Sequence, residues 1–162
     1  MKVILFLSLY LLVSTTYGGT ETRKVSFEEA MLGIPGQWIN FERKGCLLIG
    51  ERSVDTNDYL KICKYTSDND KVYFSMNDDG EWEAVTEGAP VLADVNFTSK
   101  FKGMSAIVSC RIRDDAGYHS TQCFQAEIDL PENISYIFTG IGNSSFFEQY
   151  KKIYLSFNVI DK

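Results

Sequence analysis

The sequence has little basic charge and no long hydrophobic run beyond its first residues, and each shortage excludes a class of function. The 162 residues include 16 lysines and arginines against 22 aspartates and glutamates, which gives a formal net charge of −6. A nucleic-acid-binding surface needs a basic face, so no nucleic-acid partner is expected. After residue 18, no stretch approaches the roughly 18 apolar residues of a membrane-spanning helix, so no membrane insertion is expected.

The sequence is also poor in the groups that most catalytic sites use. His119 is the only histidine, whereas a zinc site or a nucleophile–histidine pair needs further ligands or a matched nucleophile. A nucleophile elbow, an HExxH zinc helix and a phosphate-binding loop are all missing. We therefore predict a protein that is not an enzyme, with no catalytic residue, no metal and no cofactor. A small secreted hydrolase that uses His119 or paired carboxylates is an alternative.

Calcium is the one cofactor that stays as an alternative. The segments SDNDK (67–71) and NDDG (77–80) bring aspartates to both ends of a predicted strand, and calcium prefers oxygen ligands. Their spacing differs from that of a helix–loop–helix calcium loop. Asp and Asn are also ordinary turn residues, which is the preferred interpretation.

The N-terminus is typical of an exported protein. Lys2 precedes an apolar run from Val3 to Val13, and Thr16 and Gly18 occupy the −3 and −1 positions of a cleavage site. This pattern predicts a signal peptide over residues 1–18. Residues 19–162 then form a single secreted, extracellular β domain of ordinary size.

Four cysteines remain in that domain. An even number in an exported chain predicts two disulfides. We favour Cys46–Cys63 and Cys110–Cys123, because both pairs are local and suit neighbouring antiparallel strands. Strict alternation places Cys110 on an apolar face and Cys123 on a polar face. A direct bridge therefore requires a break in alternation near Gly117, or else one of the two pairs with Cys46 or Cys63.

Three Asn-x-Ser/Thr sequons also fit an extracellular protein. They begin at Asn96, Asn133 and Asn143. Because such a sequon is the acceptor for N-linked glycans, these three asparagines are the predicted glycosylation sites.

Apolar and polar residues alternate with a period of two along most of the chain. Examples are KVYFSM (71–76), MSAIVSCRI (104–112), CFQAEIDL (123–130) and KKIYLSFNVI (151–160), the last being the most regular. Turn clusters recur between these runs. The pattern predicts an all-β fold, an antiparallel β-sandwich, with a barrel as the second choice.

Only the segment SFEEAMLG (26–33) predicts a helix. Ser26 is a suitable N-cap and Glu29, three residues later, completes a capping box. Gly33 and Pro35 end the segment within two turns. At most one short N-terminal helix is therefore expected.

The segment from Ser109 to Cys123, SCRIRDDAGYHSTQC, concentrates reactive side chains. Asp114, Asp115, Tyr118 and His119 are candidate ligand-binding residues there. The plainer interpretation is a polar turn between two strands, with Gly117 supplying conformational freedom.

Two consecutive aromatic residues are further candidates. Phe146 and Phe147 cannot both face inward on an extended segment, so one of them is a possible loop-tip anchor for a ligand. The alternative is that both pack beneath the loop.

Residues 82–160 resemble an H-type lectin domain. The similar features are the strands VNFTSKF and MSAIVSC, the acidic turn Asp114–Asp115 and the terminal strand KKIYLSFNVI. The resemblance implies a six-stranded antiparallel sandwich that binds galactose-type sugars between subunits. It assigns the family's acidic position to Asp114 or Asp115, while the sugar-contacting arginine has no counterpart in QCFQAEIDL.

Gly36-Gln37-Trp38 is similar to the G-x-W motif of lipocalin barrels, whose tryptophan seals the closed end below a ligand cavity. The favoured interpretation remains a secreted, non-enzymatic protein that recognises an extracellular glycan or protein partner through loops. A lipocalin-like carrier of a small hydrophobic ligand is the alternative. The sequence leaves the ligand and the oligomeric state open.

Overall fold

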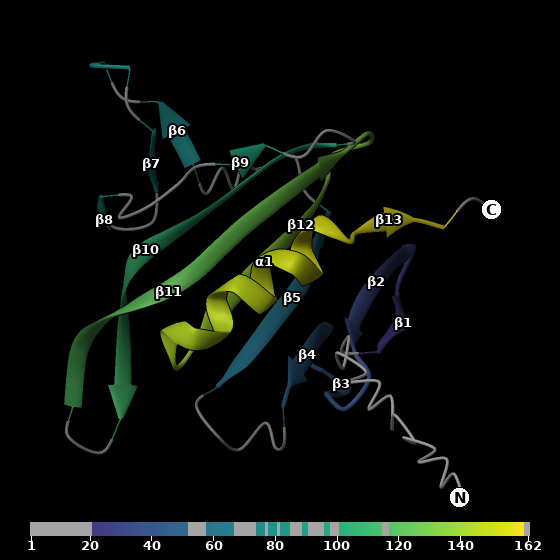
Figure 1. The fold of residues 1–162 in the computed structure, drawn as a ribbon. Coiled ribbons are helices and arrows are strands. Elements are labelled where there is room, and N and C mark those ends of the chain that lie inside the picture. The colour runs from purple at the N-terminus through teal and green to yellow at the C-terminus, as the bar shows by residue number, and fades with distance from the viewer. Residues whose placement is uncertain are drawn as a thin grey trace, which may run out of the picture.

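The structure is a computed structural model that describes most of the chain between residues 21 and 160. The described ranges are 21–51, 58–66, 74–76, 78–80, 82–84, 89–90, 96–97, 101–114 and 117–160. Antiparallel strands dominate these ranges, and an α-helix follows near the C-terminus (Figure 1). The elements are β1 (Thr22–Phe27), β2 (Ala30–Pro35), β3 (Ile39–Arg43), β4 (Cys46–Gly50), β5 (Tyr59–Thr66), β6 (Phe74–Met76), β7 (Trp82–Ala84), β8 (Ala89–Pro90), β9 (Asn96–Phe97), β10 (Lys102–Asp114), β11 (Gly117–Leu130), β12 (Ile134–Ile141), the 3₁₀ turn η1 (Ser144–Phe146), α1 (Phe147–Leu155) and β13 (Asn158–Val159).

The strands confirm the predicted all-β antiparallel class in a sandwich-like arrangement. The central sheet has the order β3-β4-β5-β12-β11-β10-β9, and smaller sheets are formed by β1-β2-β13 and β6-β7-β8. Helix α1 packs on β11, β12 and β2. It thus lies in the same layer as the β1-β2-β13 sheet, against the central sheet (Figure 1). Among the described strands the central sheet is open, with edges at β3 and β9. The predicted sandwich is therefore confirmed, whereas the barrel, the second choice, does not fit these strands.

The predicted N-terminal helix is wrong, because residues 26–33 form a β-hairpin instead. Ser26 pairs with Met31 and Phe27 with Ala30 across a turn at Glu28, whose φ is 53°. Alternate residues of β1 and β2 are buried in the core: Val25, Phe27, Ala30, Leu32 and Ile34. Burial of this period-two set outweighs the local capping signal.

The predicted terminal strand is also wrong, because the first half of KKIYLSFNVI belongs to α1 and only Asn158–Val159 form a strand, β13. The helix buries Phe147, Tyr150, Ile153 and Tyr154, which recur at helical spacing on one face. Read from Lys151 onward, the segment also alternates, with Ile153 and Leu155 on one side, but the helix leaves Leu155 exposed and buries Tyr154. The helical period prevails because it adds the two aromatic residues before Lys151 to the core. This segment was a main element of the resemblance to H-type lectins.

At β10 and β11 the central sheet has buried residues on both faces, which explains the apparent conflict between the cysteines. Phe124, Ala126 and Ile128 of β11 face α1, whereas Met104 and Val108 of β10 belong to a second cluster on the other side. Each strand therefore has its own apolar alternation, and the two alternations face opposite ways.

The register then allows a direct bridge in the long hairpin. Cys110 lies opposite Thr121, so Cys123, two residues further along β11, is on the same face as Cys110. No break in alternation is needed.

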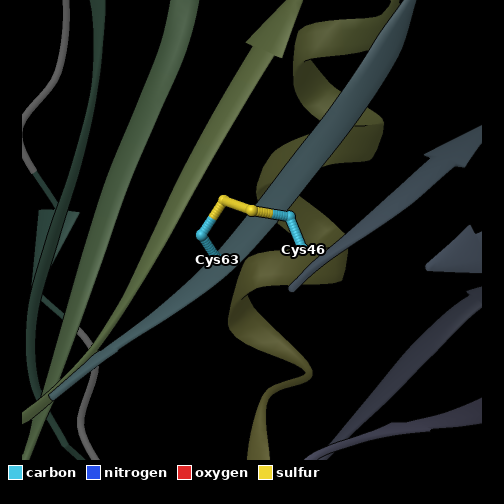
Figure 2. The surroundings of a disulfide bond; sticks show 2 residues. All are labelled: Cys46 and Cys63. Carbon is cyan, nitrogen blue, oxygen red and sulfur yellow. A yellow bond between two sulfur atoms is a disulfide. The ribbon is translucent and has the colours of Figure 1, made fainter. Parts of the chain in front are cut away.

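Both predicted disulfides are confirmed. Cys46 lies directly opposite Cys63 on β4 and β5, with 4.3 Å between the Cα atoms (Figure 2). Cys110 and Cys123 join β10 to β11 with 5.9 Å between the Cα atoms. In the described part of the chain, no helix is long and apolar enough to cross a membrane.

Candidate functional site

The hairpin of β10 and β11 extends well beyond the rest of the central sheet. The two strands, 13 and 14 residues long, pair along their whole length. Strand β12, however, pairs only with Phe124–Leu130, and β9 pairs only with Met104 and Ser105. Residues 109–122 are here called the projecting hairpin (Figure 1). Within the described ranges, no third strand pairs with it.

A disulfide closes the base of the projecting hairpin. Cys123 is fully buried and directly precedes Phe124, the first residue of β11 that pairs with β12. The bridge to Cys110 therefore fixes the two strands to each other where support from the sheet ends. A two-stranded hairpin alone is only marginally stable in water, so this covalent link compensates for the missing neighbours.

One face of the projecting hairpin combines two arginines and a tyrosine. Arg113 lies opposite Tyr118, and Arg111 lies two residues away on the same face. The Cζ atoms of Arg111 and Arg113 lie 4.7 Å and 5.4 Å from the centroid of the Tyr118 ring. Both arginines are exposed, and 62% of Tyr118 is accessible to solvent. We call these three residues the Arg–Tyr–Arg cluster.

Cation–π attraction between the guanidinium groups and the ring favours this arrangement of the three side chains. The ion pairs found among the described residues involve Lys64, and neither Arg111 nor Arg113 forms one there. Among the described residues, no carboxylate therefore competes for their N–H donors.

The structure places the residues predicted for this turn on two sides of the hairpin. Tyr118 belongs to the Arg–Tyr–Arg cluster, whereas His119 is exposed on the opposite face. Asp114 pairs through its backbone position with Gly117. The side chain of Asp114 and all of Asp115 lie outside the described residues.

Sequence reasoning missed the two arginines, although a signal was present. In Arg111-Ile112-Arg113, the arginines are two residues apart and must share one face of a strand. That Tyr118 lies on the same face follows only from the hairpin register.

Phe146 and Phe147 are not loop-tip anchors, which corrects that prediction. Only 3% of Phe147 is exposed. Phe146 packs edge-on against Trp38 at 5.7 Å and stacks with Tyr150 at 6.3 Å between ring centroids. Both residues face the core because η1 and α1 turn the chain by about 100–120° per residue, rather than the 180° of a strand. Trp38 is thus a core residue of the sandwich rather than the floor of a closed barrel.

Two of the three predicted glycosylation sites are exposed. Asn133 lies in the turn between β11 and β12, and Asn143 precedes η1, where its Oδ1 accepts a hydrogen bond of 2.9 Å from the Ser145 N–H. The side chain of Asn96, in β9, lies outside the described residues. Exposure at Asn133 and Asn143 fits the need of a glycan for free surface.

A polar cluster elsewhere has a structural role. Lys64 Nζ donates hydrogen bonds of 2.7 Å and 2.6 Å to the two carboxylate oxygens of Glu29, and the Tyr136 hydroxyl donates a third of 3.0 Å to Oε2. The bonds from Lys64 lower the pKa of Glu29 to about 2. Burial, aided by the bond to Glu29, raises the pKa of Tyr136. The cluster fastens the β1–β2 turn to β5 and β12.

Metal ligands do not gather in the part of the chain that the structure describes, where no group of three His, Cys, Asp or Glu side chains could hold an ion. Asp78 and Asp79 form a turn. The segment 67–71, the other half of the calcium alternative, lies outside the described residues.

Comparison with known proteins adds information on the fold. No protein-family model matches the sequence, and no curated protein matches it. The fold is similar to the solution structure of cyanobacterial PsbP (CyanoP) from Synechocystis, with a TM-score of 0.52, 9% identity, and coverage of 89% of this chain and 95% of that one.

A crystal structure from Bacteroides thetaiotaomicron matches with a TM-score of 0.47 and 12% identity. The match covers 83% of this chain but only 46% of the Bacteroides chain. At 9% identity, the likeness to the PsbP structure concerns the fold alone.

Proposed function

We propose that the protein is a secreted, non-enzymatic binding protein that recognises an extracellular protein or glycan partner through the projecting hairpin. The observation that carries this proposal is the Arg–Tyr–Arg cluster, exposed on a disulfide-closed hairpin beyond the edge of the sheet. Tyr and Arg are the side chains most enriched at the energetic centres of interfaces.

The construction of the hairpin supports a role in binding. Long exposed strands are a liability, because their free edges invite aggregation. Here the disulfide at the base and the arginines over Tyr118 hold such strands together. Ordering before binding reduces the entropy lost when a partner docks.

Secretion is supported by the predicted signal peptide together with the two disulfides. Disulfides persist in oxidising compartments and are rare in the cytosol. Both bridges join neighbouring strands of the central sheet, and no free cysteine is found.

A carrier function has no comparable support. The space between the central sheet and α1 is filled by aromatic side chains, among them Tyr136, Phe138, Tyr150 and Tyr154, each 1% exposed or less. A carrier of small hydrophobic ligands needs a cavity at that place.

The test is affinity capture from the native extracellular fluid, in parallel with a glycan array. The wild-type chain is compared with Tyr118→Ser and with Phe41→Ser, which removes an aromatic residue of 38% exposure from β3 instead. We expect Tyr118→Ser to lose the partner retained by the wild type, while Phe41→Ser keeps it. Equal capture by Tyr118→Ser and the wild type would refute the proposal.

A further inference from the structure

We infer that the partner of the projecting hairpin is an extracellular protein whose docking surface presents carboxylates to Arg111 and Arg113. This inference rests on the proposed function and adds the chemistry of the partner. It follows from the N–H donors of the two guanidinium groups, from the spacing of the two arginines and from the net negative charge of the chain.

The first step concerns the donors that the arginines keep. Both guanidinium groups lie over the π face of the Tyr118 ring, and each guanidinium group carries its N–H donors in a planar fork. That fork matches a carboxylate, with which it forms two parallel hydrogen bonds. Neither arginine is paired with a carboxylate in the described part of the chain.

The second step concerns spacing. Arg111 and Arg113 are two residues apart on one strand, so their Cα atoms are separated by about 7 Å. Both guanidinium groups converge on one ring, which brings them nearer to each other than an extended pair would be. Two neighbouring acidic side chains of a partner loop are then sufficient to engage both.

The third step excludes a long polyanion as the favoured ligand. The chain carries a net charge of −6 and has a pI of about 4.8. A sulfated glycan chain is long enough to extend beyond the hairpin and would meet this negative charge, which repels it. A folded protein can place a compact acidic patch on the hairpin alone, and Tyr118 offers it an aromatic contact of the kind common at protein interfaces.

The experiment is an NMR titration of the secreted chain at low salt. The probes are an acidic peptide, Ac-GDEDEG-NH₂, its neutral analogue Ac-GNQNQG-NH₂, and a heparin octasaccharide. We expect the acidic peptide to shift the Nε–Hε signals of Arg111 and Arg113 but not that of the exposed Arg43. The double variant Arg111→Gln/Arg113→Gln should weaken peptide binding at least about tenfold.

Each contrary result has a definite meaning. Tighter binding of the octasaccharide than of the peptide at the same two arginines would overturn the inference in favour of a sulfated glycan. Equal shifts with the neutral analogue, or none with the acidic peptide, would show that the cluster does not select carboxylates. If Tyr118→Ser still abolishes capture from extracellular fluid in those cases, the proposed function survives and only this inference fails.

Discussion

Glu29 shows how one carboxylate holds two parts of the sandwich together. It follows the left-handed residue Glu28 in the β1–β2 turn and accepts hydrogen bonds from Lys64 of β5 and Tyr136 of β12. These bonds favour the ionised carboxylate, and the pKa falls from 4.5 to about 2. Because the pKa is lower in the folded state, the stabilisation is complete above the unfolded value. It is lost as the pH falls from about 4.5 toward 2.

Glu29→Gln should therefore weaken the dependence of stability on pH between about pH 2 and pH 5. The thermal midpoint of the wild type should exceed that of the variant most at about pH 5 and above, and the gap should close toward about pH 2. The control is Glu28→Gln, because the Glu28 carboxylate is 52% exposed and lies 3.8 Å from Lys64 Nζ. Parallel profiles for the two variants would contradict the role of Glu29.

Gly140 permits the close packing of α1 on the sheet. A Cβ atom at this position of β12 would overlap the ring of Tyr150. Tyr150 is only 1% exposed and contacts Trp38, Phe124 and Phe146, so it has no space into which to retreat.

We expect Gly140→Ala to lower the free energy of unfolding by about 1–3 kcal/mol through overpacking. Urea denaturation provides the measurement. Gly33→Ala is the matched control, because its Cβ would lie 3.4 Å from Ser156 Cβ, which is an ordinary contact. An equal loss in both variants would show that the tight fit at Tyr150 is not the cause.

At the scale of elements, the two halves of the β10–β11 hairpin differ in their support. In the inner half, β11 pairs with β12 and contacts α1, whereas the projecting half has the Cys110–Cys123 bridge at its base. Local stability should follow this division, since segments with few buried contacts open most readily.

Replacing Cys110 and Cys123 with serine should thus loosen only the projecting hairpin. Amide hydrogen exchange should speed up at 111–114 and 117–122 and stay slow at 124–130. The Cys46→Ser/Cys63→Ser variant, which removes the bridge between β4 and β5, should leave the projecting hairpin unchanged. Uniformly faster exchange across β11 in the Cys110/Cys123 variant would contradict a local role for that bridge.

Elements with a single unambiguous period were predictable from the sequence, and elements that fit two periods were not. The alternation at 104–112 and 123–130 predicted the two strands of the long hairpin. The Cys110–Cys123 bridge was favoured from its short sequence separation, whereas strict alternation placed the two cysteines on different faces. The segment 147–155 fits both a strand and a helix, and only the site where its aromatic residues pack decides between them. The Arg–Tyr–Arg cluster depends on the pairing of Arg113 with Tyr118, which short-range patterns do not specify.

At the scale of the whole molecule, the sandwich core is filled, and the proposed binding surface lies outside that core. The large buried side chains lie between the central sheet, the smaller β1-β2-β13 sheet and α1. The projecting hairpin adds little to this core. Variation there should alter binding with little effect on folding.

Expression of the full chain in eukaryotic cells tests whether the protein is secreted, glycosylated and fully disulfide-bonded. We expect secreted protein that begins at residue 19, carries N-glycans at Asn133 and Asn143, and has no thiol open to alkylation before reduction. Peptide mass spectrometry before and after glycosidase treatment measures all three. Alkylation of Cys110 or Cys123 in unreduced protein would contradict the disulfide assignment.

Site-specific photocrosslinking in the native extracellular fluid tests the central claim most directly. A benzophenone amino acid replaces Tyr118 in one sample and Phe41 in a second, both in the full chain. The account predicts that the probe at position 118 crosslinks to a discrete partner, that excess wild-type protein suppresses the product, and that the probe at position 41 does not form it. A partner crosslinked from position 41 and not from position 118 would contradict recognition through the projecting hairpin.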